Sequence, residues 1–387
     1  MDFSLSPEQR AFRDEVRAYI RERLPAEIRE RLRQGHPPRR EDTVAWQRIL
    51  HERGWAAPHW PRRYGGAELG MAERLILLDE LYRAPAPLPL AFNVTMLGPV
   101  LLRYGTEAQR EHFLPKLARL DLWFCQGFSE PGSGSDLASL RTRARRDGDA
   151  YIVDGQKIWT TTAHLADWMF ALVRTESGAR KQDGISFLLI DLLTPGITIR
   201  PIVSIDGEHH LNEVFLDGVR VPLGNLVGEE HRGWDCAKFL LGNERTGIAN
   251  IGFCRERLDY ARELAGRRLH GGRPMSDDPA LRAELATLDA EIRALEVTNW
   301  RFLLGEQAPR ELPAYASVLK LKGVELQQAL AALLARIDGT AGLERRGTPG
   351  PQGQGPLTPR YLYSRAASIY GGTSEVQKDI LARAIIG

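Results

Sequence analysis

The hydrophobic pattern of this chain changes period twice, and this change limits the folds that it can adopt. Apolar residues recur at helical spacing through roughly the first 120 residues, and helical spacing returns from Trp234. Between them, from residue 122 to about residue 228, short β-type runs are separated by turn residues. This order differs from the strand–helix alternation of a nucleotide-binding α/β sheet. We therefore predict an α+β multidomain fold with an N-terminal α-helical domain (1–120), a central all-β, barrel-like domain (121–230) and a C-terminal four-helix bundle (231–387).

The N-terminal third begins with a clear helix start. Ser6 can serve as the N-cap, Pro7 occupies the first helical position, and Gln9 completes a capping box. Apolar residues then recur at helical spacing in several later stretches, which predicts further helices at 44–53, 71–82, 92–104 and 107–117.

The central third predicts short strands in a small barrel or orthogonal sandwich. Asp154-Gly155 lies between two β-type runs, 151–153 and 156–159, and an Asp-Gly pair in that position predicts a hairpin turn. Further strands are expected at 168–174, 185–190, 197–202 and 213–221.

The last third predicts long helices and one loop. Asp278-Pro279 begins a helix whose apolar seam consists of Leu281, Leu285, Leu288, Ile292, Leu295 and Phe302. A second helix is expected at 313–337, and Gly and Pro residues predict a mobile loop at 344–360. Residues 370–374 interrupt the final helical stretches, and Thr373 or Ser374 can cap the last helix.

The net charge, the length of the apolar runs and the cysteine spacing exclude several classes of function. A net charge of +2 over 387 residues gives no electrostatic footprint for nucleic acid, and no apolar run approaches the roughly 20 residues that span a bilayer. The three cysteines lack the spacing of a metal site or a disulfide framework, and the N-terminal residues lack a targeting pattern. We expect a cytoplasmic protein without a metal site.

Two segments suggest a flat, heteroaromatic ligand. Phe124 and Cys125 end an apolar run that leads into small and hydroxyl residues up to Asp136, and about twenty residues later Trp159 is followed by three threonines. Missing β-carbons, backbone donors, hydroxyls and an aromatic plane together suit a flavin. Gly132-Ser133-Gly134 is not a dinucleotide fingerprint, because Leu137 stands where the third glycine would be.

These residues resemble a known family from end to end. Residues 126–136, 154–159, 243–245 and 369–375 are similar to motifs of the acyl-CoA dehydrogenases. Within that family the chain most resembles the bacterial branch that contains the large subunit of pimeloyl-CoA dehydrogenase. The resemblance implies the acyl-CoA dehydrogenase fold, FAD, an acyl-CoA thioester substrate and β-oxidation chemistry that forms a trans-2-enoyl-CoA. It also implies an electron-transfer flavoprotein as oxidant.

The resemblance assigns roles in flavin and substrate binding. Gln126, Phe128 and Ser129 would lie against the flavin, Trp159 would cover its edge, and Thr161 would bond near its reactive nitrogen. Gly134 and Ser135 would line the path of a phosphate or of pantetheine.

Further contacts to FAD would come from Arg268, Thr373 and Glu375, and Arg268 matches an arginine that reaches the FAD pyrophosphate of a neighbouring subunit. A guanidinium at position 268 suits a pyrophosphate. Here the sequence departs from the family: Gly271 replaces an aromatic residue, and a Gly-Gly element appears as Asp338-Gly339-Thr340. These departures put the cross-subunit contacts in doubt. A homo-oligomer or a heteromer with a second acyl-CoA dehydrogenase subunit is expected.

The sequence departs most from the family pattern at the position of the catalytic base. The reaction removes an α-proton, and in many members the glutamate that does this follows the tyrosine of the last motif. That position is Gly371 here, which retains only a backbone N–H as a donor to the thioester carbonyl. Other branches place the base on a helix before an arginine, which predicts Glu244 as base and Arg245 as an anchor for its surroundings or for CoA.

Three alternatives stay open. The chain could be an oxidase or hydroxylase that uses molecular oxygen on the same fold, a non-catalytic or partly catalytic subunit of a heteromer, or a helical binding module without a cofactor. The length, branching or dicarboxylic character of the acyl group, and the choice between CoA and a carrier protein, do not follow from the sequence.

Overall fold

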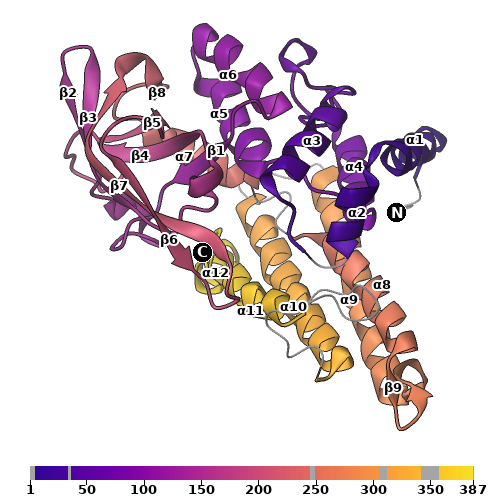
Figure 1. The fold of residues 1–387 in the computed structure, drawn as a ribbon. Helices are drawn as coiled ribbons and strands as arrows, with labels where there is room; N and C mark the ends of the chain where they lie inside the picture. Colours follow the sequence, from indigo (N-terminus) through magenta and orange to yellow (C-terminus); the bar gives the residue numbers. More distant parts are fainter. Residues whose placement is uncertain (1–4, 34–35, 245–248, 305–311, 341–356, 387) are drawn as a thin grey trace.

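The computed structural model describes residues 5–33, 36–244, 249–304, 312–340 and 357–386. A large sheet lies beside the N-terminal helices, and long C-terminal helices extend away below both (Figure 1). Helical, sheet and helical regions thus follow one another along the chain, as the change of hydrophobic period predicts. In this described part of the chain, no helix combines the length and apolar character needed to cross a membrane.

The N-terminal region is helical, and its first helix starts as predicted. The Ser6 hydroxyl accepts the Gln9 N–H at 3.2 Å, and the Gln9 side chain accepts the Ser6 N–H at 2.9 Å, which completes the capping box. The predicted stretches also form helices, whereas the helix at 26–33 was not predicted. The elements are α1 (Pro7–Arg23), α2 (Ala26–Arg33), α3 (Arg40–His51), η1 (Arg62–Tyr64), α4 (Met71–Arg83), η2 (Phe92–Leu97), α5 (Gly98–Tyr104) and α6 (Glu107–Arg119).

The helix predicted at 92–104 is two elements rather than one. Its first half, η2, is a π-helical segment, and the α-helical α5 follows it directly. The buried Asn93 side chain links this segment to the start of the sheet, since it donates to the Leu122 carbonyl at 2.7 Å and accepts the Phe124 N–H at 3.1 Å. Short π segments are frequent at functional sites.

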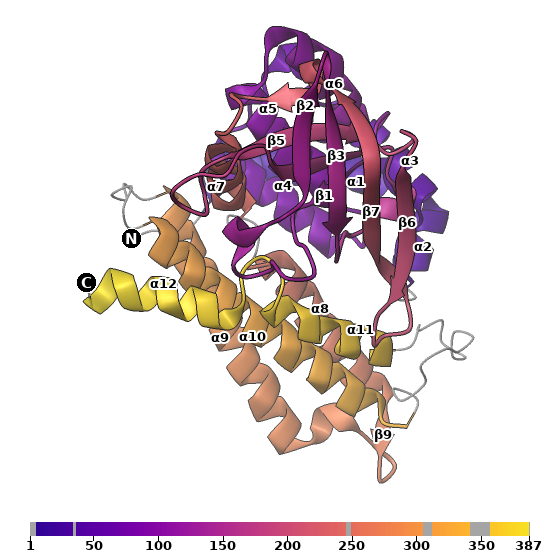
Figure 2. The ribbon, with the colours of Figure 1, turned by 90° about the vertical axis from the view of Figure 1, so that its left-hand side faces the viewer.

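The central region is an eight-stranded mixed sheet with the order β6-β7-β3-β2-β4-β5-β8, and β1 pairs with β4 (Figure 2). The β1–β4 pairing is parallel, and the long ladders of β7 with β3 and β6 are antiparallel. The strands are β1 (Phe124–Gly127), β2 (Arg143–Asp147), β3 (Ala150–Lys157), β4 (Trp168–Arg174), β5 (Ile185–Asp191), β6 (Ile197–Val203), β7 (His209–Pro222) and β8 (Leu226–Val227).

The predicted hairpin turn at Asp154-Gly155 is wrong. Strand β3 continues through both residues, and its register with β7 shifts between Val153 and Gly155, which marks a β-bulge. The Asp154 carboxylate accepts the Gly218 N–H at 2.7 Å and so holds the bulge against β7. The turn that joins β2 to β3 instead contains Gly148, whose φ is +60°.

The C-terminal region confirms the predicted seam, because its six apolar residues are all buried along one helix. Helix α10 packs against α8, α9 and α12. The loop predicted at 344–360 ends too late, since residues 357–360 begin a helix, and residues 344–356 lie outside the described part of the chain. The helices are α7 (Gly233–Glu244), α8 (Ile251–Arg267), α9 (Pro279–Leu304), α10 (Leu312–Asp338), α11 (Leu357–Tyr363), η8 (Ser364–Ser368) and α12 (Ser374–Ile386); β9 (Leu269–His270) and β10 (Arg273–Pro274) form a small hairpin.

Helix α7 packs with the first two regions rather than with the long C-terminal helices. Its Cys236, Ala237 and Leu240 belong to the same buried cluster as Val100 of α5 and Phe187 of β5. The helix therefore bridges the N-terminal helices and the sheet, and Glu244 is its last residue.

A close contact in the N-terminal core gives a first prediction. Trp60 is fully buried, its indole N–H donates to the Val94 carbonyl at 3.1 Å, and a β-carbon added at Gly98 would lie only 1.8 Å from its ring. Gly98→Ala should lower the free energy of unfolding by about 3 kcal/mol, the upper range for overpacking, measured by denaturant unfolding. Gly242→Ala in α7 is the control: nothing lies within 4 Å of the added carbon, so stability should stay equal or rise slightly.

Candidate active site

The two segments predicted to bind a flavin meet at one edge of the sheet. The Ile158 N–H, just after β3, donates to the Ser129 carbonyl, just after β1, at 3.0 Å. Trp159 follows; the residue is 55% exposed and its backbone lies in the left-handed region, at φ +60°. A bulky residue rarely adopts this conformation, and such residues cluster at ligand sites. The geometry therefore brings Ser129 and Trp159 together, as expected.

The polar groups of this edge are available to a ligand. The N–H groups of Thr160 and Thr162 donate to the carbonyls of Asn212 and His210 at 3.0 and 2.8 Å. The alternate N–H groups, of Trp159 and Thr161, have no partner in the described residues, nor do the hydroxyls of Ser129 and Thr161. The edge thus offers two N–H groups, two hydroxyls and an exposed indole that make no hydrogen bond within the described residues.

Phe128 and Gln126 differ in what they can contribute. The Phe128 ring is buried and packs edge-on against Phe170 and Phe187, with centroids 5.7 and 6.2 Å apart. The ring therefore belongs to the core, and the backbone of Phe128 is what can reach a ligand. Gln126 lies on β1 and is partly buried.

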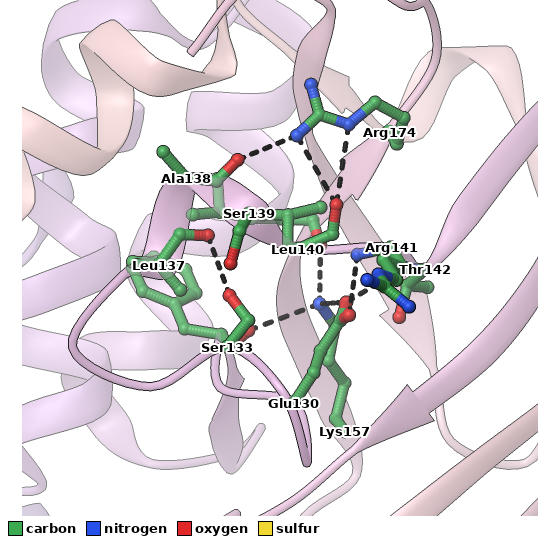
Figure 3. Close-up of polar contacts among 12 residues, drawn as sticks. Glu130, Ser133, Leu137, Ala138, Ser139, Leu140, Arg141, Thr142, Lys157 and Arg174 are labelled. Atoms are coloured by element: carbon green, nitrogen blue, oxygen red, sulfur yellow. Dashed lines mark hydrogen bonds and ion pairs between the residues drawn. The ribbon is translucent and has the colours of Figure 1, made fainter. Parts of the chain in front are cut away.

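A buried ion pair fixes the loop that carries Ser129 (Figure 3). The Lys157 ammonium donates to the Glu130 carboxylate at 2.7 Å, to the Leu172 carbonyl at 2.7 Å and to the Phe128 carbonyl at 3.2 Å. The other contacts of Glu130 come from backbone donors, the N–H groups of Arg141 at 2.6 Å and Thr142 at 2.9 Å. Lys157 is fully buried and Glu130 nearly so, and every proton of the ammonium has an acceptor.

Burial and ion pairing shift the pKa values of Glu130 and Lys157 in opposite directions. Burial opposes ionisation of Glu130, but the Lys157 ammonium and the two backbone donors outweigh it, so the pKa of Glu130 is lowered. Burial also lowers the pKa of Lys157 to about 8 against the attraction of Glu130. Both groups are therefore charged at pH 7, as the fully satisfied geometry requires.

The residues predicted to line a phosphate or pantetheine path lie on the exposed tip of the same loop. Glu130 and Ser133 close a tight turn through reciprocal backbone hydrogen bonds of 3.0 and 2.9 Å. The Ser133 hydroxyl donates to the carbonyls of Asp136 and Leu137, and these hydrogen bonds hold the far side of the loop. Gly134 and Ser135 between them are exposed, and a β-carbon at Gly134 would meet nothing within 4 Å.

The turn before α12 is held by a lysine. The buried Lys320 ammonium donates to the Gly372 carbonyl at 2.7 Å and also contacts the Tyr370 carbonyl. Gly371 adopts φ +62° and Gly372 adopts φ +87°, values that favour glycine. The Thr373 hydroxyl accepts the Val376 N–H at 3.2 Å and caps α12, as predicted.

The predicted cross-subunit residue, Arg268, lies at the C-terminal end of a long helix and pairs within its own chain. Arg268 follows the last residue of α8, a helix of 17 residues, so it lies about 25 Å from the start of that helix. Its Nε donates to the nearly buried Asp338 carboxylate at 3.0 Å, and this pairing gives Arg268 a role within its own chain. Gly271, the residue that departs from the family, forms the β9–β10 turn with φ +58°. Glu375 is exposed at the start of α12.

The predicted base falls at the edge of the described residues. The backbone of Glu244 ends α7, but its side chain lies outside the described part, and so does Arg245. The chain resumes at Ala249, and Asn250 adopts φ +48° before α8 begins. The Asn250 side chain accepts the Tyr82 hydroxyl at 2.6 Å and donates to Gln327 at 3.3 Å.

Two neighbouring cavities share part of their wall. The interdomain cavity, of about 860 Å³, lies between the β6–β7 turn and helices α8, α10 and α11, and Tyr370 is in its wall. The N-terminal cavity, of about 800 Å³, lies among α4, η2, α5 and α7. Tyr82 and Asn250 line both cavities. Phe239, five residues before the end of α7, lines the N-terminal cavity, and Asn250, six residues after that end, lines both cavities.

Comparison with known proteins decides the family. Models described as the N-terminal, middle and C-terminal domains of acyl-CoA dehydrogenase match residues 6–121, 125–219 and 231–386. The acyl-CoA dehydrogenase IpdE1 of Mycobacterium tuberculosis is 36% identical over 383 residues, which cover 97% of each chain. The chain belongs to the acyl-CoA dehydrogenase family.

Solved structures of this family agree with that assignment. The chain matches the ChsE4-ChsE5 complex of Mycobacterium tuberculosis with a TM-score of 0.84 at 33% identity, covering 100% of this chain and 99% of the other. It matches the Tcur3481-Tcur3483 steroid ACAD with a TM-score of 0.86 at 31% identity, again covering 100% and 99%.

Members of the acyl-CoA dehydrogenase family are FAD-dependent flavoproteins, and the residues present here fit a flavin. The unpartnered N–H groups and hydroxyls at positions 129, 159 and 161 match a planar ring that needs donors along one edge. The buried Thr160 hydroxyl also lacks a partner in the described residues. Ser129, Trp159 and Thr161 are the residues that would hold the ring.

Three residues of this acyl-CoA dehydrogenase site received no role from the sequence. Glu130 and Lys157 lie inside the recognised motifs, and Lys320 lies on a helix between apolar residues. The sequence did contain one signal: each lysine stands among positions that the hydrophobic pattern predicts to be buried. Lysine is normally exposed, so this signal can be interpreted only once the acceptors of its ammonium group are known.

The buried pair gives a second prediction. Lys157→Met should lower the free energy of unfolding by about 3–5 kcal/mol at pH 7, because the Glu130 carboxylate stays buried without its cation. Glu130 has a lowered pKa, so its stabilising contribution is present above its ordinary value of 4.5 and is lost as the pH falls. The difference between variant and wild type should therefore narrow in acid, as measured by denaturant unfolding over a pH series.

Lys181→Met is the matched control. Lys181 pairs with Asp136 of the same loop at 2.6 Å, but both side chains are more than half exposed. Its loss should change stability by less than about 1 kcal/mol. Equal losses for the two variants would contradict the role assigned to Lys157.

Proposed function

We propose that this chain catalyses the α,β-dehydrogenation of an acyl-CoA thioester to the trans-2-enoyl-CoA, with Glu244 as the general base. The observation that carries the proposal is the position of α7, which lines the N-terminal cavity and ends at Glu244, combined with a glycine at position 371. The turn at 371 offers no carboxylate, so a base from another element is needed, and Glu244 ends a helix that lines the N-terminal cavity.

Each of several groups of this chain has a separate role in the proposed dehydrogenation. The Glu244 carboxylate takes the α-proton, and a carboxylate does this well near neutral pH only where a dry site raises its pKa. The Gly371 N–H, held in its turn by Lys320 and Gln377, donates to the thioester carbonyl as negative charge develops there. Bound FAD supplies the acceptor for the β-hydride. Ser129, Trp159 and Thr161 orient the ring beside the substrate.

The acyl group that we propose is bulky and contains rings. A solved relative is named a steroid ACAD, and the two cavities of about 860 and 800 Å³ offer room for a ring system beside the thioester. Electrons would pass to an electron-transfer flavoprotein in the cytoplasm.

We further propose that the chain works beside a second, different acyl-CoA dehydrogenase subunit. Two of the similar solved structures are named for two different chains, and one of them is called a complex. The intrachain pairing of Arg268 with Asp338 also favours this arrangement, because it competes with a contact to a neighbour's pyrophosphate. Thr373 and Glu375, at the start of α12, are proposed as further contacts to FAD.

Replacing the proposed base gives a third prediction. Glu244→Gln should reduce the rate of flavin reduction by acyl-CoA by about 100- to 10,000-fold, while the flavin spectrum and FAD content stay unchanged. Anaerobic stopped-flow absorbance measures both. Glu229→Gln, at an exposed glutamate before α7, is the control and should reduce the flavin at the wild-type rate. Normal reduction by the Glu244 variant would refute the assignment.

The choice of oxidant gives a fourth prediction. Steady turnover should require an artificial electron acceptor or an electron-transfer flavoprotein, and air-saturated buffer alone should yield no hydrogen peroxide. A peroxidase-coupled assay measures this directly. Stoichiometric peroxide would instead identify an oxygen-using flavoenzyme on the same fold.

A further inference from the structure

A buried asparagine holds the segment that carries Trp159 and Thr161. Asn212 of β7 is fully buried, and its carbonyl accepts the Thr160 N–H at 3.0 Å. Its side-chain amide donates to the Thr160 carbonyl at 2.9 Å. Both backbone groups of Thr160 are thus bonded to one residue. In such a ladder alternate residues bond the neighbouring strand, which leaves the N–H groups of Trp159 and Thr161 available to a ligand.

This segment depends on such a contact because its backbone is strained at both ends. Trp159 adopts φ +60° and Thr162 adopts φ +55°, and neither residue is glycine. Residues other than glycine keep left-handed conformations only where the surrounding structure imposes them. Asn212 bonds the backbone between these two positions, so it stabilises the conformation that the flavin edge needs.

Two stacked histidines complete the hydrogen bonds of the Asn212 amide. The rings of His164 and His209 are stacked with centroids 3.8 Å apart. A carbonyl only accepts, so the amide NH2 faces Thr160, and its second proton faces Nδ1 of His164 at 3.2 Å. The amide oxygen then accepts from Nε2 of His209 at 2.8 Å. This network is complete only when Nδ1 of His164 carries no proton.

The described surroundings of His164 do not favour a charge on its ring. His164 lies in the turn η4 (Ala163–Leu165), which packs against β1, β6 and β7. Partial burial and the neighbouring His209 and His210 lower the pKa of His164 from its ordinary value of 6.5. No carboxylate of the described residues lies within ion-pair distance of this ring.

The other charged groups near this turn have partners of their own or are exposed. The pairs are Asp206 with His210, Glu213 with Gln156, Arg200 with the ring of Phe215, and Asp167 with Arg40. Glu208 is exposed in the turn between β6 and β7, and β1 carries only the buried thiol of Cys125. His164 is therefore mainly neutral at pH 7.

We propose that Asn212 and a neutral His164 position the flavin-binding segment, so that FAD affinity falls when His164 takes up a proton at Nδ1. A protonated Nδ1 and the amide NH2 are both donors, so the amide moves away from His164 and from the Thr160 carbonyl. The strained backbone around Thr160 then loses the contact that holds it. Both are positioning residues, since they act through Thr160. This inference rests on the FAD site of the proposed function.

The first test follows FAD binding by the full, flavin-free chain over a pH series, by fluorescence titration. Because the FAD-bound form keeps His164 neutral, the affinity should be constant above about pH 7 and weaken about threefold or more by about pH 5.5. His164→Phe keeps a flat ring against His209 but has no proton to take up, so its affinity should be nearly independent of pH over this range.

His112→Phe is the matched control for the pH series. His112 is also an exposed histidine beside an aromatic ring, but it lies on α6, away from β7. This variant should keep the pH profile of the wild type. A wild-type affinity that does not change with pH would overturn the inference, as would a pH dependence that survives His164→Phe.

The second test uses a readout that a loss of stability alone would not move. Asn212→Ala should bind FAD about tenfold or more weakly at pH 7, and at saturating FAD the long-wavelength absorption band of the bound flavin should shift. Glu213→Gln is the control, because successive side chains of a strand point to opposite faces, and it should keep both the affinity and the spectrum. Wild-type affinity and spectrum in Asn212→Ala would contradict the role of Asn212.

The outcomes separate this inference from the proposed function. His164 is exposed, so His164→Phe still decides the inference if Asn212→Ala does not fold. Tight FAD binding that is independent of pH overturns the inference and leaves the proposed function standing. A chain that binds no FAD at any pH would overturn both.

Discussion

One buried ammonium group, that of Lys157, supports the whole ligand-binding edge of the sheet. Its donors bind the carbonyls of Phe128 and Leu172 and the carboxylate of Glu130, so one side chain joins β3, β4 and the segment after β1. Glu130 in turn holds the backbone at positions 141 and 142. Ser129 and Trp159 are therefore positioned by an interaction that neither of them makes. Such fully satisfied polar networks specify one arrangement, because any partial break leaves a buried charge.

Local patterns predicted the fold where local interactions decide it. The capping box of Ser6 and the apolar seam of α9 are each contained in one stretch of sequence, and both were confirmed. The Asp154-Gly155 pair was misread because the same residues suit a turn and a bulge, and pairing with the distant β7 selects the bulge. The end of the predicted loop at 360 was misplaced because α11 packs on α10, a contact far away in the sequence.

The candidate site shows the same difference between what local sequence predicts and what distant contacts decide. Motif similarity identified Ser129 and Trp159 as neighbours, and the Ile158–Ser129 hydrogen bond joins their segments. Lys157 and Lys320 were not assigned roles, since a buried lysine and an exposed one look alike in sequence until their carbonyl partners are in place. Asn212 is a similar case: its sequence context in β7 is ordinary, and only its bonds to the distant Thr160 distinguish it from other polar residues of that strand.

The π-helical segment η2 has a consequence for how the N-terminal cavity can change. Val94, Thr95 and Met96 of this segment are in the cavity wall, and a π turn contains one more residue than an α turn. Deleting one residue there would restore α-helical geometry and rotate the preceding residues by about 100° around the axis. A single codon deletion or insertion could thus present a different set of side chains to the acyl group while leaving the flanking helices in place. Length variation at this point is a route by which related enzymes could diverge in specificity.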